Sequence, residues 1–585
     1  MKFYLAVYAV ALAVYAAVAW PHTHPPYIDS FYYVDIARNL ARGQGFTEGF
    51  VWNYLSGTPP IRHPSSEYWL PALSVLLAPA FLVGTGYRGA TLLTAAIAAL
   101  LPLLAARIGC DLFGTRRHAL TMAALTLFNG IWFHDWTTPD AFVPAAVLTA
   151  TTLLLASHAL QGRGPWGGGL ALCAAGATAG LDALTRQEGL LLAPALVLAV
   201  LLTRGALGRL GPRGLVGAAA LYGAVQAPWL WHNLIVLGAP GASGGSRTLW
   251  MRSYDAFYAR RTGALTADAY LRWGLDNIMA ARLHAILFTL EIWAALWLVV
   301  LVPPLLVGLW QLRRRVELRP FFCYWAILAL SMPLLFTATI EHGTLLHASG
   351  GLLPFTSALI VAGIDAVAAA VVRLTAAGRR SRRRGHAHPD AAMAPPSHDP
   401  GSERHRPGGA RVPKQVPRPQ SASAALRSRP HALRSRPQAL APPAARRPRS
   451  QALASPGAGR LACDLDALAV ALAVLVSLVM TARTFPAHGD EYTHDTRVAA
   501  WLHAHNPRGA PVMVLDPPLF SYLDGGSYVV APSDDIDAVL AVAHRYGVRY
   551  WALDPLEAPY AGTRIRAAGL SLAGTVDGVL MYRVG

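Results

Sequence analysis

Charged residues are scarce in this chain of 585 residues. They make up 14% of it, against about a quarter of an average soluble domain, whereas 54% of the residues are hydrophobic. Cysteines are also few: Cys110, Cys173, Cys323 and Cys463 are far apart, and each lies within or beside an apolar run. Their spacing excludes a cysteine metal site, and we expect no disulfide. The shortage of charge excludes an ordinary soluble domain and predicts a polytopic membrane protein.

The strongly basic charge belongs to one segment. Residues 373–460 hold 18 Arg and one Lys against three acidic residues, which accounts for nearly all of the net charge of +18. The rest of the chain is close to neutral. The charge therefore describes this segment and gives no reason to expect a nucleic acid partner for the apolar body.

Apolar runs of membrane-spanning length recur along the chain and predict about eleven transmembrane helices. The first run lacks a following small-residue cleavage site, so we interpret it as a retained helix rather than a signal peptide. The expected spans are 3–20, 88–107, 119–134, 141–160, 168–184, 188–203, 214–236, 285–310, 320–340, 350–372 and 464–482.

Arginine clusters predict the orientation of these spans. Every cluster that lies between two spans falls on the same side if the N-terminus is cytoplasmic, as the positive-inside rule requires. Counting the apolar run 69–83 as a further span would reverse this agreement. That run lies between Pro71 and Gly84 and contains Pro79, so we expect a helix on the outer membrane face instead.

Four regions follow from this topology. Residues 1–377 form the transmembrane module, and residues 461–483 form the final transmembrane helix. The Pro-, Ala- and Arg-rich residues 378–460 are expected to be a disordered cytoplasmic linker, with anionic lipid or nucleic acid binding as the alternative. Residues 484–585 predict a small extracytoplasmic α/β domain. In it, strand-like PVMVLD, SYVVAP and VRYWALD accompany a helical DDIDAVLAVAHRYG, without a glycine-rich phosphate motif.

The first outward loop begins with IDSFYYVDIARNLARGQGF, residues 28–46. From Ser30 its apolar residues recur at helical spacing, which predicts an amphipathic helix along the membrane surface, ended by Gly43 and Gly45. Asp29 precedes this helix, where it either caps the helix or belongs to a functional site. Asp35 and Arg38, three residues apart, are expected to pair on the exposed face.

Other outward loops add polar and aromatic residues to the same side of the membrane. The first loop continues with Arg62 and His63 among several aromatics. The next carries Asp140, which either caps the fourth span or contributes to a site. EHGTLLHASGGLLPF, at the outer end of the tenth span, brings Glu341, His342 and His347.

This combination resembles the GT-C glycosyltransferase superfamily. The resemblance rests on an Asp after the first span, a Tyr-rich helix running to GQGF, an aromatic and proline-rich segment after it, and an Asp in the second outward loop. Within that superfamily the chain is most similar to the users of polyprenyl-phosphate sugars, such as protein O-mannosyltransferases and aminoarabinose lipid A transferases. Ile28–Asp29–Ser30 departs from the paired acids of many members, which makes metal binding at Asp29 less expected.

The resemblance implies that Asp29 is the general base of an inverting sugar transfer. A phosphate leaves as an anion, so one carboxylate that accepts the proton of the attacking hydroxyl is sufficient. Asp140 would orient substrate hydroxyls. The remaining candidates for substrate binding are Arg38, Arg62, His63, Tyr33, Glu341, His342 and His347, with Arg62 and His347 the first choices for the donor phosphate and Arg186 of LTRQEG a further one.

The sequence thus predicts a cell-membrane glycosyltransferase with its active site on the extracytoplasmic face. Its partners would be membrane lipids, a polyprenyl-phosphate-linked sugar donor and a hydroxyl acceptor on protein, lipid or glycan. The sequence indicates no particular cofactor, and participation of a divalent cation stays open. A transporter or lipid flippase is the alternative, disfavoured because ionisable residues are rare inside the spans. Gly-rich GASGGS, before a basic aromatic stretch in the loop 237–284, suggests either a mobile lid or a plain surface loop.

Overall fold

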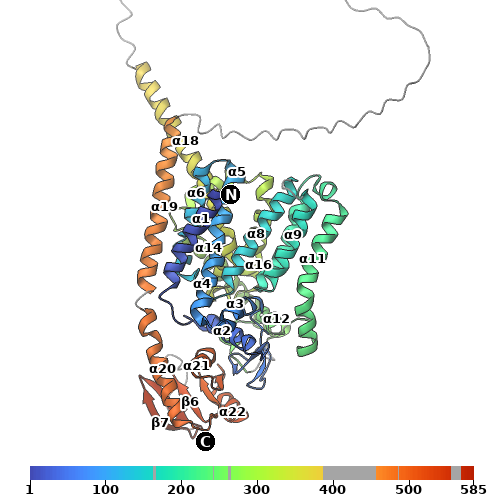
Figure 1. Cartoon of the computed structure of the whole chain (residues 1–585), viewed down its shortest axis with the longest axis vertical. Helices are drawn as coiled ribbons and strands as arrows, with labels where there is room; N and C mark the ends of the chain where they lie inside the picture. Colours follow the sequence, from blue (N-terminus) through green and yellow to red (C-terminus); the bar gives the residue numbers. More distant parts are fainter. Residues whose placement is uncertain are drawn as a thin grey trace, which may run out of the picture.

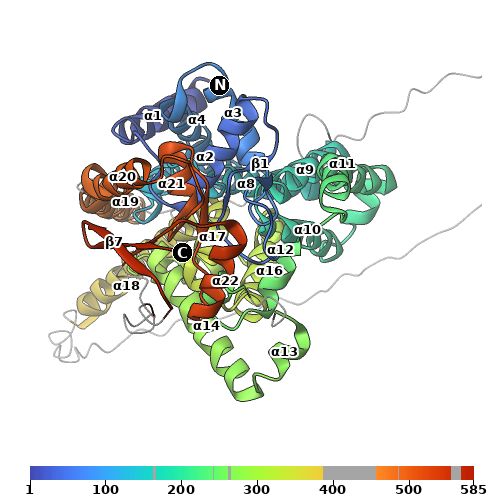
Figure 2. The same ribbon diagram turned by 90° about the horizontal axis from the view of Figure 1, so that it is seen from below.

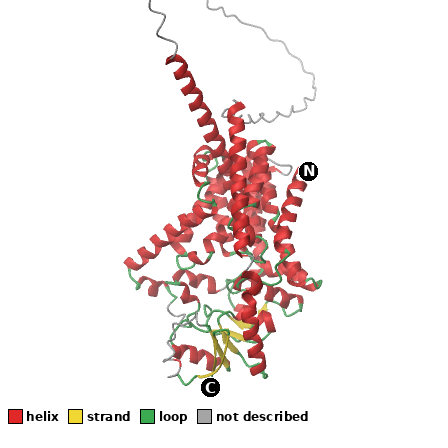
Figure 3. Cartoon of the chain, turned by 90° about the vertical axis from the view of Figure 1, so that its left-hand side faces the viewer, coloured by secondary structure: helices red, strands yellow, loops and turns green. Residues whose placement is uncertain are grey.

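The computed structural model describes residues 1–162, 167–241, 243–260, 265–385, 456–484, 487–554, 565 and 568–584. A bundle of helices forms the upper part of the molecule, and an α/β domain lies at its lower end (Figures 1 and 3). The predicted fold class, a polytopic helical protein with a small C-terminal α/β domain, is confirmed.

The first half of the chain is mainly helical, with three short strands in the first outward loop. Its elements are α1 (Lys2–Ala19), α2 (Ile28–Ala41), β1 (Thr47–Glu48), β2 (Phe50–Val51), β3 (His63–Pro64), α3 (Ala72–Leu82), α4 (Gly86–Ala98), α5 (Leu100–Phe113), α6 (Arg116–Leu127), α7 (Trp132–Asp135), α8 (Phe142–Gln161), α9 (Gly167–Ala183), η1 (Gln187–Leu191), α10 (Leu192–Leu201), α11 (Ala206–Leu237), α12 (Ser243–Arg247), η2 (Thr248–Trp250) and η3 (Tyr254–Phe257).

The second half completes the bundle and then forms the α/β domain. Its elements are α13 (Ala267–Leu271), α14 (Leu275–Leu296), α15 (Val302–Leu312), η5 (Val316–Leu318), α16 (Arg319–Leu335), η6 (Ile340–His342), α17 (Thr344–Ser349), η7 (Gly350–Leu352), α18 (Leu353–Gly385), α19 (Pro456–Thr484), α20 (Ala487–His505), β4 (Val512–Val514), α21 (Pro517–Asp524), β5 (Tyr528–Val530), α22 (Ile536–Tyr546), β6 (Tyr550–Leu553), β7 (Ser571–Val576) and β8 (Val579–Arg583).

Seven helical segments of the described chain are long and apolar enough to cross a membrane. They are Lys2–Ala19, Gly86–Phe113, Phe142–Gln161, Leu275–Leu296, Val316–Leu335, Thr344–Arg379 and Pro456–Arg483. The expected spans at 119–134, 168–184, 188–203 and 214–236 are helical for most of their length but are not among these seven, so the count of eleven stays a prediction. Helix α3 has 11 residues, too short to cross a hydrocarbon core about 30 Å thick, as expected for the run 69–83.

The single span expected at 285–310 is wrong. The chain leaves the helical conformation at Leu298 and Val299, whose φ angles of 55° and 59° are rare for residues with a side chain, and this break separates α14 from α15. Two prolines at the start of α15 fit the break, because proline is tolerated in the first turn of a helix but not in its interior. The span therefore begins earlier, at Leu275.

Glycines allow two pairs of helices to approach closely. A Cβ added at Gly176 of α9 would overlap the backbone of Ala218 on α11. Likewise, Cβ atoms at Gly308 of α15 and Gly363 of α18 would overlap the backbone of Leu359 and Pro304. Small residues at helix contacts are common in membranes, where close packing replaces the hydrophobic effect as the force between helices.

One polar cluster holds the last long helix against the bundle. Arg117 of α6 pairs with Asp365 of α18 and, at 3.4 Å from its Nε, with Asp466 of α19. His118 Nε2 lies 2.8 Å from the other Asp365 oxygen. This α19 polar cluster (Arg117, His118, Asp365 and Asp466) is one polar anchor of α19; lower on the helix, Gly130 N donates to the buried Ser477 hydroxyl at 2.9 Å.

Replacing Arg117 by alanine is expected to destabilise the protein by about 3–5 kcal/mol, because two buried carboxylates then lose their shared cation. Thermal unfolding in detergent, followed by tryptophan fluorescence, measures the effect. The matched control is R116A, since Arg116 is exposed and only faces the ring of Phe3 at 5.9 Å. Equal melting temperatures for R117A and R116A would show that the cluster does not anchor α19.

The C-terminal domain contains the three predicted strands and the predicted helix. Strands β5, β4 and β6 run parallel, and Asp535 caps α22 because its side chain accepts a hydrogen bond from Ala538 N at 3.0 Å. The sheet is larger than expected, with the order β2-β5-β4-β6-β8-β7. Its edge strand β2 comes from the first outward loop and pairs with β5 through Phe50 and Val51. The loop and the domain therefore fold as one structure, and the view from below shows α21 of the domain beside α2 (Figure 2).

The two ends of the molecule separate the basic linker from the candidate site residues. The N-terminus and the ends of α18 and α19 that border residues 386–455 lie at the top of the bundle, while α2, α3 and the C-terminal domain lie at the bottom (Figure 1). This arrangement agrees with the predicted topology, although it does not identify which end is cytoplasmic.

A cysteine placed at Arg508, exposed in the C-terminal domain, is expected to react from outside intact cells with an impermeant thiol reagent. A cysteine at Arg116, exposed at the opposite end, should react only after the membrane is opened. The four native cysteines are first replaced by serine, because Cys463 is exposed at the linker end of α19. The reverse labelling pattern would invert the topology and move the candidate site to the cytoplasm.

Candidate active site

Asp29 lies in the first turn of α2 and is half-buried. The residue at the N-cap is Tyr27, and no side chain caps the helix, so the alternative that Asp29 is the cap is wrong. No hydrogen bond from another described residue reaches the Asp29 carboxylate. Its position still suits a carboxylate, since the first turn of a helix favours negative charge. The group is fixed by the backbone and its oxygens are available to a ligand.

A second carboxylate and one guanidinium surround Asp29. Burial and the negative charge of Asp140 raise the pKa of Asp29 well above its ordinary value, while Arg186 opposes the shift. Asp140 is fully buried, and its own pKa is raised by burial and lowered by Arg186. Two acids that share one cation have coupled titrations, so at least one of them resists ionisation.

Asp140 has one oxygen near the backbone and one without a partner. Phe142 N donates to Oδ1 at 3.4 Å, but the N-cap of α8 is Ala141 and no side chain caps the helix, so the alternative that Asp140 is the cap is wrong. The Oδ2 atom is buried and has no hydrogen-bond partner among the described residues. A buried oxygen without a donor is costly unless a ligand or water supplies one. Asp140 is therefore suited to accept a hydrogen bond from a bound molecule.

Arg186 is the cation of this cluster. It lies between α9 and η1, and its Nη2 donates to Glu188 Oε1 at 2.8 Å. Its Nε is buried without a hydrogen-bond partner in the described part of the chain. Burial opposes its charge, but Glu188, Tyr33 and Asp140 raise its pKa, so the guanidinium stays protonated. The sequence offered Arg186 only as a further choice, behind Arg62 and His347, because its approach to Asp29 and Asp140 cannot be read from a linear motif.

The C-terminal domain contributes a third acid. Asp516 caps α21 by accepting from Leu519 N at 3.2 Å, and it also raises the pKa of Asp29. Burial raises the pKa of Asp516 itself to about 7. In the sequence the Asp-Pro-Pro motif indicates only a helix start. Its approach to α2 is a tertiary contact that no local pattern encodes.

A ladder of aromatic rings borders the cluster. Trp52 stacks on Trp69 at 3.9 Å and on Phe257 at 5.4 Å between ring centroids, and Tyr254 stacks on Phe257 at 5.5 Å. Burial and the Asp29 carboxylate raise the pKa of Tyr254 to about 12, which indicates that this end of the ladder lies near Asp29. The loop 237–284 thus reaches the site through η3. Among the described residues, its basic aromatic stretch after GASGGS forms short helical turns and no single long helix. That the loop moves as a lid stays a prediction.

Tyr33 and the residues near η6 occupy different environments. Tyr33 is fully buried against Tyr32 and Trp69, so its ring has no free face for a sugar. His342 stacks on Tyr254 at 3.5 Å, and burial lowers its pKa. Glu341 pairs with His284 on the surface. Of these three residues Tyr33 lies nearest the Asp29 cluster, because it interacts directly with Arg186, whereas His342 approaches the cluster only through its stack on Tyr254.

His347 belongs to α17 and packs against the first residue of α8. Its ring stacks on Phe142 at 4.9 Å and lies 5.8 Å from Trp132. The neighbouring residue Phe142 also donates its N–H to Asp140, so His347 borders the buried side of the cluster. The structure leaves its predicted role in phosphate binding untested.

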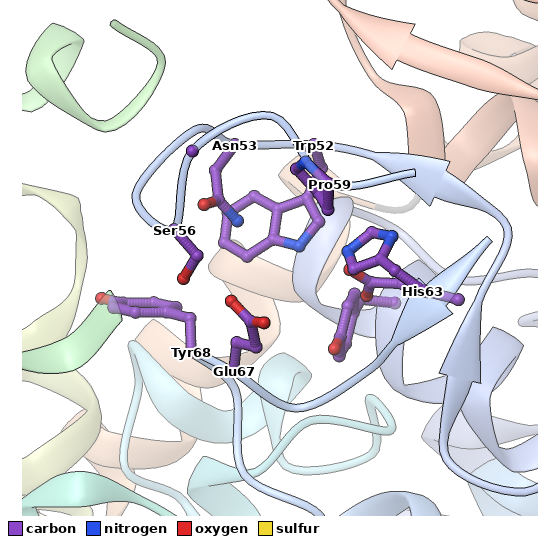
Figure 4. A pocket seen from close by; sticks show the side chains of 10 residues that line it. Trp52, Asn53, Ser56, Pro59, His63, Glu67 and Tyr68 are labelled. Atoms are coloured by element: carbon purple, nitrogen blue, oxygen red, sulfur yellow. The ribbon is translucent and has the colours of Figure 1, made fainter. Parts of the chain in front are cut away.

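His63 belongs to a buried pair in the first loop. Its Nε2 lies 2.5 Å from Glu48 Oε1, and its Nδ1 lies 3.1 Å from the Ile61 carbonyl oxygen. Both ring nitrogens are used within the protein, so the predicted substrate contact is replaced by a structural one. Figure 4 shows the adjacent cavity of about 20 Å³, into which Glu67 points; it has room for about one water molecule.

Arg38 and Arg62 lie away from Asp29. The guanidinium of Arg38 lies 3.9 Å above the ring of Tyr522 and donates to the Tyr522 carbonyl oxygen at 3.3 Å. It therefore makes no contact ion pair with Asp35, and Asp35 is buried rather than on an exposed face, so both expectations for this pair were wrong. The amphipathic surface helix is likewise wrong: α3 and α21 cover α2, and most of its residues are buried. Arg62 and Arg38 line a separate cleft.

The described residues contain no cluster of three or more His, Cys, Asp or Glu side chains that could hold a metal ion. The Asp29 cluster contains Asp29 and Asp140, and Asp516 of the C-terminal domain acts on it as a third acid. The Arg186 guanidinium would compete with a metal ion for these carboxylates. Its chemistry is that of a base beside an anion site: a carboxylate with a raised pKa, an unpaired buried oxygen, and a cation that is only partly satisfied.

No protein family model matches the chain, and a search of curated proteins gives no match. Among solved structures, the chain is similar to ArnT from Cupriavidus metallidurans bound to undecaprenyl phosphate, with 15% identity and a TM-score of 0.51 over 100% of this chain and 98% of that one. It is also similar to the oligosaccharyltransferase AglB from Archaeoglobus fulgidus in complex with an inhibitory peptide and a dolichol-phosphate, with 12% identity, a TM-score of 0.52, and coverage of 94% and 69%.

Both of these proteins have the GT-C fold, and this chain shares it. The fold and the apolar helices define a multi-pass membrane protein of GT-C architecture, with its polar side-chain cluster at the end of the bundle that carries the C-terminal domain. The expectation drawn from the sequence is thus confirmed at the level of the fold.

Proposed function

We propose that this protein is an inverting membrane glycosyltransferase that moves a sugar from a polyprenyl-phosphate donor to a hydroxyl acceptor on the extracytoplasmic face. The observation that carries the proposal is the half-buried Asp29 carboxylate, which has a raised pKa, lies beside Asp140 and Arg186 and accepts no hydrogen bond from another described residue. A poised base next to an anion site, within a GT-C fold, fits transfer from a lipid phosphate.

The chemical step needs one proton acceptor. The acceptor oxygen attacks the anomeric carbon from the face opposite the phosphate, the bond from that carbon to the phosphate oxygen breaks, and Asp29 takes the hydroxyl proton. The lipid phosphate leaves with the electron pair as an anion. A raised pKa makes Asp29 a stronger base than an ordinary aspartate, provided that the pH keeps it ionised.

Arg186 is assigned to the donor phosphate in place of Arg62. Its Nε lacks a protein partner and its positive charge acts directly on Asp29 and Asp140, whereas Arg62 belongs to another cleft. Guanidinium groups bind phosphate through charged, directional hydrogen bonds. Asp140 would accept hydrogen bonds from substrate hydroxyls through its unpaired Oδ2, and His342 and His347 would border the bound donor.

The ligands of the structural neighbours support the same substrate class. The ArnT structure holds undecaprenyl phosphate, and the AglB structure holds a dolichol-phosphate and a peptide. A transporter is the alternative class. Asp182, the acid buried inside α9, accepts from Thr149 through Oδ2 at 2.5 Å, which ties it to helix packing, and its Oδ1 is buried without a partner among the described residues. A single such oxygen does not make an ion path, which needs several polar groups in series.

The direct test is transfer by the purified full-length protein in lipid nanodiscs. Donors with different sugars, labelled with tritium on a short polyprenyl phosphate, are mixed with membrane extract as the source of acceptor. The proposal predicts a labelled product and release of polyprenyl phosphate from at least one donor. Absence of product from every donor, with a well-folded protein, would oppose it.

A further inference from the structure

A cleft of about 660 Å³ opens between the second half of α2, the first outward loop and the turn from α21 to β5. Its polar lining includes Asp35, Arg38, Asn39, Arg42, Arg62 and Tyr522. We propose that this cleft binds an anionic saccharide and that this saccharide is the part of the acceptor that decides which substrates are used. Binding itself is independent of the proposed function, whereas the acceptor role rests on it.

Two of its arginines have no partner within the protein. Arg42 and Arg62 are exposed, and neither makes a side-chain hydrogen bond or ion pair in the described part of the chain. Arg38 is held by Tyr522 but keeps its charge at the cleft. Three guanidinium groups that converge on one space favour a ligand with phosphate or carboxylate groups.

The acids of the cleft do not cancel this charge. Asp524 is used internally, since it accepts from Gly526 N at 2.7 Å and from the Tyr528 hydroxyl at 2.5 Å. Asp35 is 8% exposed, and burial raises its pKa to about 6 against the opposing effect of the three arginines. The cleft therefore keeps a positive excess near neutral pH.

The remaining lining favours a sugar over a small inorganic anion. The Gln44 amide can both donate to and accept from hydroxyls, and the Asp35 carboxylate can accept from them. Asn39 already donates to the Thr47 carbonyl oxygen at 2.8 Å and offers its amide oxygen, and Tyr522 provides an aromatic surface beside these groups. The volume lies in the range of sites for organic ligands, about 300–1,000 Å³. One phosphate ion would fill only a small part of it.

Helix α2 connects the cleft to the candidate base. Asp29 and Arg38 are nine residues apart on this helix, which corresponds to roughly 14 Å along its axis. At about 100° per residue the two side chains point to opposite sides of the helix. A ligand in the cleft would thus be separate from the donor site but close enough for an extended acceptor to reach Asp29.

The experiment uses the full-length protein in phosphatidylcholine nanodiscs. Binding of lactose 1-phosphate is measured by microscale thermophoresis, in parallel with neutral lactose and with inorganic phosphate at equal ionic strength. We expect the phosphorylated sugar to bind at least tenfold more tightly than either. Equal affinity for lactose would overturn the role of the charge, and equal affinity for inorganic phosphate would overturn the role of the saccharide.

The double variant Arg42→Gln/Arg62→Gln is expected to bind lactose 1-phosphate at least tenfold more weakly than the wild type. Arg508→Gln, an exposed arginine of the C-terminal domain outside the cleft, is the matched control and should bind normally. If the double variant proves unstable, Gln44→Glu places a carboxylate at the rim without removing an arginine and should weaken binding too. Wild-type affinity in either cleft variant would overturn the proposal.

Two further measurements distinguish this proposal from a lipid-headgroup site and from the proposed function. Adding phosphatidylglycerol to the nanodiscs should leave binding unchanged; if it abolishes binding, the cleft is a lipid-headgroup site and the proposal is wrong. D29N should bind lactose 1-phosphate as the wild type does. A protein that binds the probe but transfers no sugar would refute the proposed function and leave the cleft assignment intact.

Discussion

Replacing Asp29 by asparagine is expected to lower the rate of sugar transfer by about a thousandfold, within the range of general-base contributions. Asparagine keeps the size and the helix position of the side chain but cannot accept the hydroxyl proton. Donor binding should change little, because the phosphate is assigned to Arg186. Single-turnover transfer of labelled sugar measures the rate, and retention of labelled donor on the protein measures binding.

The pH dependence of the wild type provides a second readout. Burial and the charge of Asp140 raise the pKa of Asp29 well above its ordinary value, and only the ionised form acts as a base. The rate should therefore fall as the pH is lowered through that raised pKa, and D29N should lose this acidic limb. The control D276N alters an exposed acid at the start of α14 and should transfer normally. Full activity in D29N would refute the assignment of the base.

Replacing Arg186 by glutamine is expected to raise the KM for the lipid-phosphate donor about a hundredfold, since hydrogen bonds to charged groups contribute about 1.5–3 kcal/mol. The kcat at saturating donor should fall much less. The lysine variant keeps the charge but loses the planar donor geometry, so it should lie between the glutamine variant and the wild type. Steady-state kinetics with varied donor concentration separates the two constants.

The control for this prediction is R204Q, which changes an exposed arginine between α10 and α11. Thermal unfolding is measured alongside, because Arg186 also holds the buried Glu188. If R186K unfolds normally and keeps the wild-type KM, the guanidinium serves only the ion pair with Glu188, and the donor phosphate binds elsewhere.

The sequence predicted the elements whose signals are local. The periods of α2, α3 and α22, and the strand patterns of β4, β5 and β6, all reflect interactions within a few residues. The break between α14 and α15 was missed because hydropathy continues across Leu298 and Val299, although the following prolines carried the signal. The position of β2 in the C-terminal sheet has no local signal at all.

The candidate site was predicted in part. Asp29 and Asp140 were chosen from motifs, and the structure brings them together. The sequence ranked Arg62 above Arg186, and this order was not based on a local signal, since both are arginines in outward loops. Only the packing of the helices distinguishes them. Asp35 was assigned to the exposed face because the C-terminal α21, which covers that face, is far away in the sequence.

The pairing of β2 with β5 has a consequence for biogenesis. The first loop is synthesised and translocated early, but the strand that completes it emerges only near the end of translation. Until then Phe50 and Val51 form an unpaired edge beside the aromatic ladder, and Asp516 is absent from the neighbourhood of Asp29. Premature termination before β5 would thus leave an unfinished catalytic face. Under the proposed function and topology, activity would therefore begin only when the last domain has crossed the membrane, and incomplete chains would not consume the lipid-linked sugar donor.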